Sequence, residues 1–228
     1  GFDRKLWTLT DLGASHARFH LFSPAGDQGY PADLLVEAEY RLHDDGHALQ
    51  ITLTAQTAQP TLCALTHHSY FALAGHRALA LAPQSAQMAK LHCPAPQYLD
   101  ADSENLPVAL CPVTGTAFDF QSPIALGSAM ALGAAEGFDH CLCLDAGAQI
   151  TLSDPISGRG LTMQSNQRGL QLYTANHLNG QVIGKGGVRY RAQDAICLEP
   201  QAWPDAPNLP AAWGAPCIVL NAGEIYRH

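Results

Sequence analysis

Apolar and polar side chains alternate along most of this chain, and this pattern predicts a fold made mainly of β-strands. The segments 35–42, "LVEAEYRL", and 48–55, "ALQITLTA", both follow it. Side chains on a strand point to alternate faces, so each segment is expected to form a half-buried strand. Asp45 and Gly46, which lie between them, predict a hairpin turn. The expected apolar face comprises Val36, Ala38, Tyr40, Leu42, Leu49, Ile51 and Leu53.

Similar short segments recur to the end of the chain, separated by turns rich in Gly and Pro. Further strands are expected in "AQITLSD", "GLTMQS", "GLQLYTA", "AICLE" and "CIVLNAG". The best helical candidate, residues 122–135, is weakened by its glycines. Many short strands with turn residues between them predict an all-β, antiparallel sandwich with few or no helices. No repeat or linker divides the sequence, so we expect a single domain over residues 1–228.

Composition excludes several classes of function. With 47% apolar and 14% charged residues, the 228-residue chain is expected to be globular. Its net charge of -8 argues against nucleic acid as a partner, because phosphates require a basic surface. The sequence contains no basic amphipathic helix and no apolar run long enough to cross a bilayer, so no membrane partner is expected. "GFDRKLW" at the start does not resemble a signal peptide.

The seven cysteines fit no common disulfide framework, because their number is odd and their spacing irregular. Cys141 and Cys143 alternate with leucines and should share one strand face. The absence of a C-x-x-C pair gives little support for zinc. We interpret the cysteines as reduced, mostly buried thiols of a cytoplasmic protein.

Four segments carry residues suited to chemistry: "LTHHSYFALAG" with His67, His68, Ser69 and Tyr70; "GFDHCLCLD" with Asp139 and His140; "GLQLYTANHLNG" with Gln171 and Tyr173; and "ICLEPQAWPDAPNLP" with Glu199. Taken singly, a histidine in an apolar run can be structural, Asp139 can cap a turn, and Gln171 can be an ordinary outward residue. Glu199 is more informative. It ends an apolar strand, where desolvation would raise the pKa of its carboxyl group and suit it to general-base catalysis.

Together, and in this order, the four segments resemble the galactose mutarotase (aldose 1-epimerase) family. "LTHHSYFALAG" is similar to the family's Leu-Thr-Asn-His-Ser-Tyr-Phe-Asn-Leu-Ala-Gly, and "GFDHCLCLD" to its Gly-Tyr-Asp-His-Asn-Phe. "LQLYTANHLNG" resembles Gln-x-Tyr-Thr-Gly-Asn, and "ICLEPQAWPDAPNLP" resembles Cys-Leu-Glu-Thr-Gln-x-x-Pro-Asp-x-x-Asn. The resemblance implies the large β-sandwich of that family, the supersandwich. It also implies that the domain is incomplete at the N-terminus and clipped at the C-terminus, without an Asn-Arg pair and a further active-site His.

The resemblance further implies an enzyme, an isomerase that interconverts the α and β anomers of a free hexose such as galactose or glucose. Glu199 would be the catalytic base and His68 the catalytic acid, on opposite sides of the anomeric centre. The substrate-binding residues would be His68, Ser69, Tyr70, Asp139 and Gln171. Tyr70 or Trp203 could also cover an apolar face of the sugar, although either could equally be a packing residue. No metal and no cofactor is implied, the partner is a small aldose, and the oligomeric state, monomer or dimer, stays open.

This chain departs from the family pattern at four places. His67, Ala72 and Ala175 replace Asn, Asn and Gly, and Pro200 replaces Thr beside the base. If residues 67 and 68 lie on a strand, their side chains point to opposite faces, so His67 is expected to be structural. Pro200 removes a backbone donor and puts the local geometry after Glu199 in question.

Two alternatives stay open. A hexose-6-phosphate 1-epimerase would need Arg or Lys near the pocket, and none of the 12 basic residues lies in the four segments. A non-catalytic sugar-binding module could share the fold, but both His68 and Glu199 are present. A Ser-His-Asp hydrolase is disfavoured, because there is no G-x-S-x-G elbow.

Overall fold

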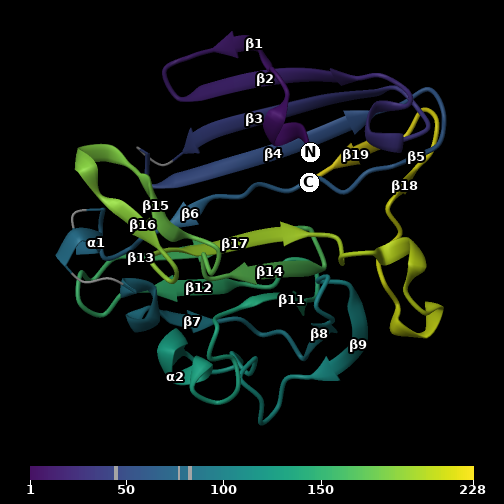
Figure 1. Ribbon diagram of the computed structural model, residues 1–228. Helices are drawn as coiled ribbons and strands as arrows, with labels where there is room; N and C mark the ends of the chain where they lie inside the picture. The colour runs from purple at the N-terminus through teal and green to yellow at the C-terminus, as the bar shows by residue number, and fades with distance from the viewer. Residues whose placement is uncertain (44–45, 77, 82–83) are drawn as a thin grey trace. The chain divides into compact units, whose positions relative to one another are not determined.

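The computed structural model describes residues 1–43, 46–76, 78–81 and 84–228, and nearly all of its regular structure is β-strand (Figure 1). The two α-helices are short, α1 (Ala78–Leu81) and α2 (Leu126–Met130). The prediction of an all-β chain with few helices is confirmed. The helix expected over 122–135 shrinks to α2, because Ile124 and Ala125 form a strand before it and glycines follow. Short 3₁₀ helices lie at Phe2–Arg4, Asp27–Gly29, Ser85–Met88, Lys185–Gly187, Ala206–Asn208 and Ala211–Trp213.

Residue contacts divide the chain into two compact units, Gly1–Thr66 with Cys217–His228, and His67–Pro216. The first unit holds a five-stranded antiparallel sheet in the order β1-β2-β3-β4-β19 and a two-stranded sheet, β18-β5. Their bounds are β1 (Thr8–Leu12), β2 (His16–Ser23), β3 (Leu34–His43), β4 (Ala48–Gln56), β19 (Ile225–Arg227), β5 (Thr61–Leu62) and β18 (Val219–Leu220).

The hairpin of β3 and β4 has the predicted alternation. Ala38 pairs with Leu53 and Glu39 with Thr52, so apolar and polar residues occupy opposite faces. The turn residue Asp45 lies outside the described residues. The expected apolar face is buried only toward Val36, where Leu21, Leu34, Ala55, Cys63 and Leu220 form a core cluster. At the other end, Leu42 and Leu49 are exposed, because this cluster does not reach them.

The second unit contains three antiparallel sheets, of which the two largest share one core. The six-stranded sheet has the order β6-β17-β14-β11-β8-β9, the four-stranded sheet β10-β7-β12-β13, and the small sheet β15-β16. Their bounds are β6 (Tyr70–Phe71), β17 (Ile196–Gln201), β14 (Gly169–Tyr173), β11 (Asp139–Cys143), β8 (Gln97–Ala101), β9 (Pro107–Pro112), β10 (Ile124–Ala125), β7 (Lys90–His92), β12 (Ile150–Ser153), β13 (Gly160–Met163), β15 (Asn179–Ile183) and β16 (Arg189–Arg191).

The core of this unit lies between the six-stranded and four-stranded sheets, which Figure 1 shows as layers. Leu142, Leu172 and Leu198 from the larger sheet join Leu91 and Leu152 from the smaller one in a single buried cluster. The core residues of these strands, Leu142 in β11, Leu170 and Leu172 in β14, and Ile196 and Leu198 in β17, alternate with other residues along the chain. Because alternate side chains point to opposite faces, the residues between these core residues lie on the sheet face away from the core.

Candidate active site

Strand register brings three of the predicted site residues together on that outer face of the six-stranded sheet. Gln171 on β14 lies directly opposite Glu199 on β17, and on its other side opposite Cys141 on β11. Asp139, two residues before Cys141, therefore lies on the same face and pairs with Tyr173. Three segments far apart in the sequence thus supply a carboxylate, an amide and a second carboxylate to one surface.

Glu199 is the most buried of these groups, with a side chain that is only 10% exposed. Burial and, to a smaller degree, the negative charge of Asp139 raise the pKa of the Glu199 carboxyl group from 4.5 to about 7. The carboxyl group is therefore poised to accept or release a proton near neutral pH. The expectation from sequence that desolvation acts on Glu199 has a clear physical basis in this geometry.

His68 reaches Glu199 from a segment without regular structure. Its Nε2 lies 3.4 Å from Oε1 of Glu199, and its side chain is 51% exposed, so its ring joins the buried carboxylate to solvent. Its ring stacks on Tyr70, with centroids 4.8 Å apart, and meets the edge of Tyr173 at 5.9 Å. These ring contacts orient the imidazole in a segment where no strand hydrogen bonds hold it.

The strand-face argument for His67 does not apply, because residues 63–69 form no strand and β6 begins only at Tyr70. His67 is half-buried, whereas His68 is exposed. Ser69, also half-buried, has no contact with Asp139, Gln171 or Glu199 among the described interactions. In the segment "LTHHSYFALAG", His68 contacts Glu199, and Tyr70 contacts the rings of His68 and Tyr173, so both lie at the polar face.

Asp139 and Gln171 form a hydrogen-bonded pair beside Glu199. Gln171 Nε2 donates to Asp139 Oδ1 at 2.8 Å, which orients the amide. The buried Gln171 Oε1 accepts no hydrogen bond from any described residue, so it is an unused acceptor at this face. Asp139 Oδ2 faces Nε2 of the exposed His177 at 3.9 Å. The backbone N–H of His177 donates to the Tyr173 hydroxyl.

A close-packed turn fixes the start of β11 and hence Asp139. Gly137 has φ +99°, and a Cβ atom there would collide with Asn176 Oδ1 and Thr174 Oγ1. Those two side chains fill the space because they bond the backbone of Phe138, whose N–H donates to Thr174 Oγ1 at 2.8 Å and whose carbonyl accepts from Asn176 Nδ2 at 2.9 Å. The segments around Gly137 and Asn176 therefore act together to position the residue that follows Phe138.

Two departures from the family pattern, Ala175 and Pro200, can be described by their backbone conformation and strand pairing. Ala175 is buried with φ +56°, in the left-handed region that glycine adopts more easily. Pro200 lies in β17 opposite Leu170, beyond the two residues that pair with β6. At that point β17 has a strand neighbour on one side only, which is where a strand tolerates proline. The strand continues to Gln201, so Pro200 does not interrupt β17.

Three potential metal ligands meet at this face. The ligand atoms of His68, Cys197 and Glu199 all lie within 4.8 Å of one another. Cys197 pairs with Tyr173 and is two residues before Glu199 on the same face of β17. Burial, followed by the charges of Glu199 and Asp139, raises the pKa of its thiol to about 12.

Sequence reasoning did not assign His177 or Cys197 to the site. For Cys197 the signal was present, because a residue two before Glu199 on a strand must share its face. For His177 there was none, since it follows the end of β14 and its direction depends on the turn. Trp203, considered as a sugar-stacking residue, is buried, and its Nε1 donates to the Arg168 carbonyl at 2.9 Å, which makes it a packing residue.

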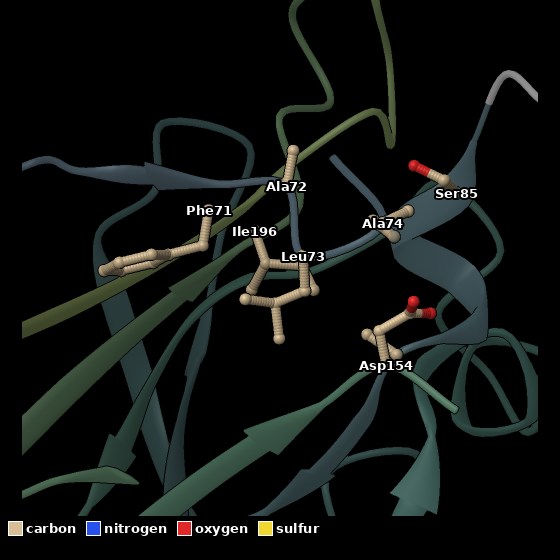
Figure 2. Close-up of a pocket in the computed structure, with 9 residues that line it drawn as sticks. Phe71, Ala72, Leu73, Ala74, Ser85, Asp154 and Ile196 are labelled. Carbon is tan, nitrogen blue, oxygen red and sulfur yellow. The ribbon is translucent and has the colours of Figure 1, made fainter. Parts of the chain in front are cut away.

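One enclosed hollow in this unit is too small for a sugar. It lies beside Phe71, Leu73, Ser85, Asp154 and Ile196, as Figure 2 shows, and measures about 10 Å³, roughly the space for one water molecule. Burial raises the pKa of Asp154, but hydrogen bonds from Ser157 outweigh it, and the net pKa lies below its ordinary value. The polar face with Glu199 is therefore the better place for a sugar-sized ligand.

Solved structures share this fold. A GalM/aldose epimerase homologue from C. elegans matches with a TM-score of 0.82 and 25% identity, over 97% of this chain and 66% of that one. Galactose 1-epimerase from Lactobacillus acidophilus matches with a TM-score of 0.77 and 28% identity, over 99% of this chain and 65% of that one. The fold is therefore that of galactose mutarotase-like β-sandwich proteins.

The sequence comparisons agree with these structural matches. The family model described as Aldose 1-epimerase matches residues 1–228, and the chain belongs to this family. Galactose mutarotases of Rattus norvegicus and Homo sapiens are each 38% identical over 233 residues. An aldose 1-epimerase of Haemophilus influenzae is 31% identical over 236 residues. The chain is covered completely in these matches but spans only 65% of the length of the two mammalian relatives. No helix among the described residues is long and apolar enough to cross a membrane.

Proposed function

We propose that this chain catalyses the interconversion of the α and β anomers of a free aldose, a hexose such as galactose or glucose. The observation that carries the proposal is the pairing of a buried carboxyl group, Glu199, with a solvent-reaching imidazole, His68, 3.4 Å away. Membership of the aldose 1-epimerase family supports the same chemistry.

Ring opening of a hemiacetal requires a proton to leave the C1 hydroxyl and a proton to reach the ring oxygen. The expectation from sequence put the base and the acid on opposite sides of the anomeric centre, whereas His68 and Glu199 lie side by side, 3.4 Å apart. Because both oxygens are bonded to C1, a base and an acid in this arrangement can still serve them simultaneously. In the proposed mechanism Glu199 accepts the hydroxyl proton, and protonated His68 donates to the ring oxygen. Rotation about the C1–C2 bond then turns the aldehyde. Closure reverses both transfers, with Glu199 as acid and His68 as base.

Substrate binding is proposed for Asp139 and Gln171, with Ser69 and Tyr70 from the neighbouring segment. The Asp139 carboxylate accepts hydrogen bonds from sugar hydroxyls, and Gln171 Oε1 accepts another. Tyr70, 49% exposed, offers an aromatic face beside His68. In the proposed mechanism Glu199 and His68 carry out both proton transfers, with no metal and no cofactor invoked.

The cytoplasm is the proposed location. All seven cysteines are free, and Cys63, Cys93, Cys141, Cys143 and Cys197 are buried. Buried free thiols are typical of proteins kept in reducing compartments.

Polarimetry on freshly dissolved α-D-galactose and α-D-glucose tests the proposed activity. The protein should accelerate mutarotation beyond the buffer rate, and Glu199→Gln should lower turnover by about 10²- to 10⁴-fold. Glu136→Gln, at an exposed carboxylate outside the site, should leave turnover unchanged. No acceleration, with retained sugar binding, would instead indicate a non-catalytic binding module. Acceleration only of a 6-phosphorylated hexose would favour the phosphosugar epimerase.

A further inference from the structure

The three ligand atoms of His68, Cys197 and Glu199 match the donor types of a zinc site. Zinc sites in proteins combine thiolate, imidazole and carboxylate ligands, and sites of the open type have three protein ligands and one water. Tetrahedral bonds of about 2.0–2.1 Å to nitrogen and oxygen place these two atoms about 3.3 Å apart. The His68 Nε2 to Glu199 Oε1 distance is 3.4 Å.

The Cys197 thiol is the ligand that must move to complete this geometry. A thiolate bound at about 2.3 Å lies roughly 3.6 Å from the other two ligand atoms, so Sγ must close a gap of at most about 1.2 Å. All three atoms already lie within 4.8 Å of one another. Solvent reaches His68, which leaves an open side for the entry of an ion and for a water as the fourth ligand.

The local charge also favours a cation. Asp139 and Glu199 lie on one sheet face on either side of Gln171, which is opposite Glu199 and hydrogen-bonded to Asp139, so two carboxylates share this surface. Their ion-pair partners among the described residues are histidines, His177 and His68, rather than Lys or Arg. A divalent ion beside Glu199 would neutralise charge that no Lys or Arg of the described residues pairs with.

We propose that His68, Cys197 and Glu199 form a binding site for a thiophilic divalent cation, with Zn²⁺ as the ion of best fit. On coordination the Cys197 thiol releases its proton to solvent and binds as the thiolate, with no change in oxidation state. The ion takes the lone pairs of Glu199 and His68. It therefore inhibits proton transfer and competes with the sugar. This inhibition rests on the proposed function, whereas the binding does not.

Cobalt titration tests the binding directly, because Co²⁺ replaces Zn²⁺ and its thiolate complexes absorb in the near ultraviolet. The purified protein should bind one Co²⁺ with a thiolate-to-cobalt band, and added Zn²⁺ should abolish the band. Cys197→Ala should lose it. Cys141→Ala, at a buried thiol on the same sheet face, should keep it, and so should Cys217→Ala at the exposed thiol. A band that persists in Cys197→Ala, or none in the unmodified protein, overturns the proposal.

A second variant keeps the test decisive if Cys197→Ala does not fold. His68 is exposed, so His68→Ala should fold and should weaken Co²⁺ binding at least tenfold. Unchanged affinity in this variant would refute the site. Zn²⁺ should also raise the apparent KM for the sugar in polarimetry, and less so in Cys197→Ala. Since cobalt absorption requires no turnover, failure of the metal site and failure of the proposed activity give separate results.

Discussion

Gln171 and Glu199 are direct cross-strand partners in the antiparallel pair of β14 and β17. Directly opposite residues have Cβ atoms only about 5 Å apart, so the sheet itself fixes the distance from the Gln171 amide, proposed to bind sugar, to the proposed base. Asp139 joins them through its hydrogen bond with Gln171. The spacing of these three groups is thus a backbone property, and changes to their side chains should alter chemistry more than geometry.

The rate of mutarotation should depend on the ionisation of Glu199. The base must be deprotonated, and the pKa of its carboxyl group is raised to about 7, so the rising, acidic limb of the kcat/KM profile should have its midpoint near that value. Because the charge of Asp139 contributes to this rise, Asp139→Asn should move the midpoint to lower pH and also increase KM. Initial rates by polarimetry between pH 5 and 9 measure both. A midpoint near 4.5 in the unmodified protein would contradict the role of burial.

Stability should depend on pH through the same group. A carboxyl group whose pKa is raised from 4.5 to about 7 on folding binds more protons in the folded than in the unfolded state between these values. The free energy of unfolding should therefore fall as pH rises from about 4.5 to 7. At about 1.4 kcal/mol per pKa unit the loss approaches about 3 kcal/mol.

Glu199→Gln should lack this contribution, so its stability relative to the unmodified protein should increase from pH 5 to pH 8. Urea unfolding at both pH values provides the comparison. Glu136→Gln serves as the control, because an exposed carboxylate carries no burial penalty. A constant difference between Glu199→Gln and the unmodified protein across this range would show that folding does not perturb the Glu199 carboxyl group.

The two adjacent histidines should differ in importance. His68 lies beside Glu199, and His68→Asn should reduce turnover by about 10²- to 10⁴-fold. His67→Asn restores the residue of the family motif and should have only a mild effect. Polarimetry under identical conditions distinguishes the variants. If His67→Asn were the more severe change, the assignment of the proposed acid would have to move to His67.

Gly137 should be intolerant of substitution. Gly137→Ala forces a side chain onto a residue with positive φ and drives its Cβ into Asn176 and Thr174, at a combined cost of roughly 3 kcal/mol. Gly147→Ala is the matched control, because Gly147 has φ +81° with nothing near its Cβ, and should cost only roughly 1 kcal/mol. Thermal unfolding measures both. Equal losses would mean that the packing of Asn176 and Thr174 against Gly137 contributes nothing.

The sequence pattern predicts part of the candidate site, namely the strand faces of the residues that lie on the six-stranded sheet. Apolar residues alternate with others along the segments that form β11, β14 and β17, so each of Asp139, Gln171 and Glu199 is expected on the face of its own strand away from the core. The order of strands in the sheet, β17-β14-β11, could not be deduced from alternation, because periodicity carries no information on which strands pair.

The remaining part of the candidate site, which includes His68 and His177, depends on tertiary contacts. Residues 63–69 resemble a strand in composition, yet only Tyr70 and Phe71 find a partner, since β6 pairs with β17 at Ile196 and Cys197 alone. The hydrogen bonds between the side chains of Thr174 and Asn176 and the backbone of Phe138 join segments more than thirty residues apart. No local sequence pattern predicts them. The direction of the His177 side chain is set by the same turn. For that reason His177 could not be assigned to the site from the sequence.

Leu198 and Glu199 are neighbours on β17, one in the core cluster and the other on the opposite face. Loss or gain of one residue upstream in this strand would exchange them, which would send the carboxylate into the hydrocarbon interior and a leucine into the polar site. Insertions and deletions should therefore be far less tolerated here than point substitutions. Tolerance of length change, mapped by codon-deletion scanning along the chain, should fall sharply at β17 and recover in the loop that follows it.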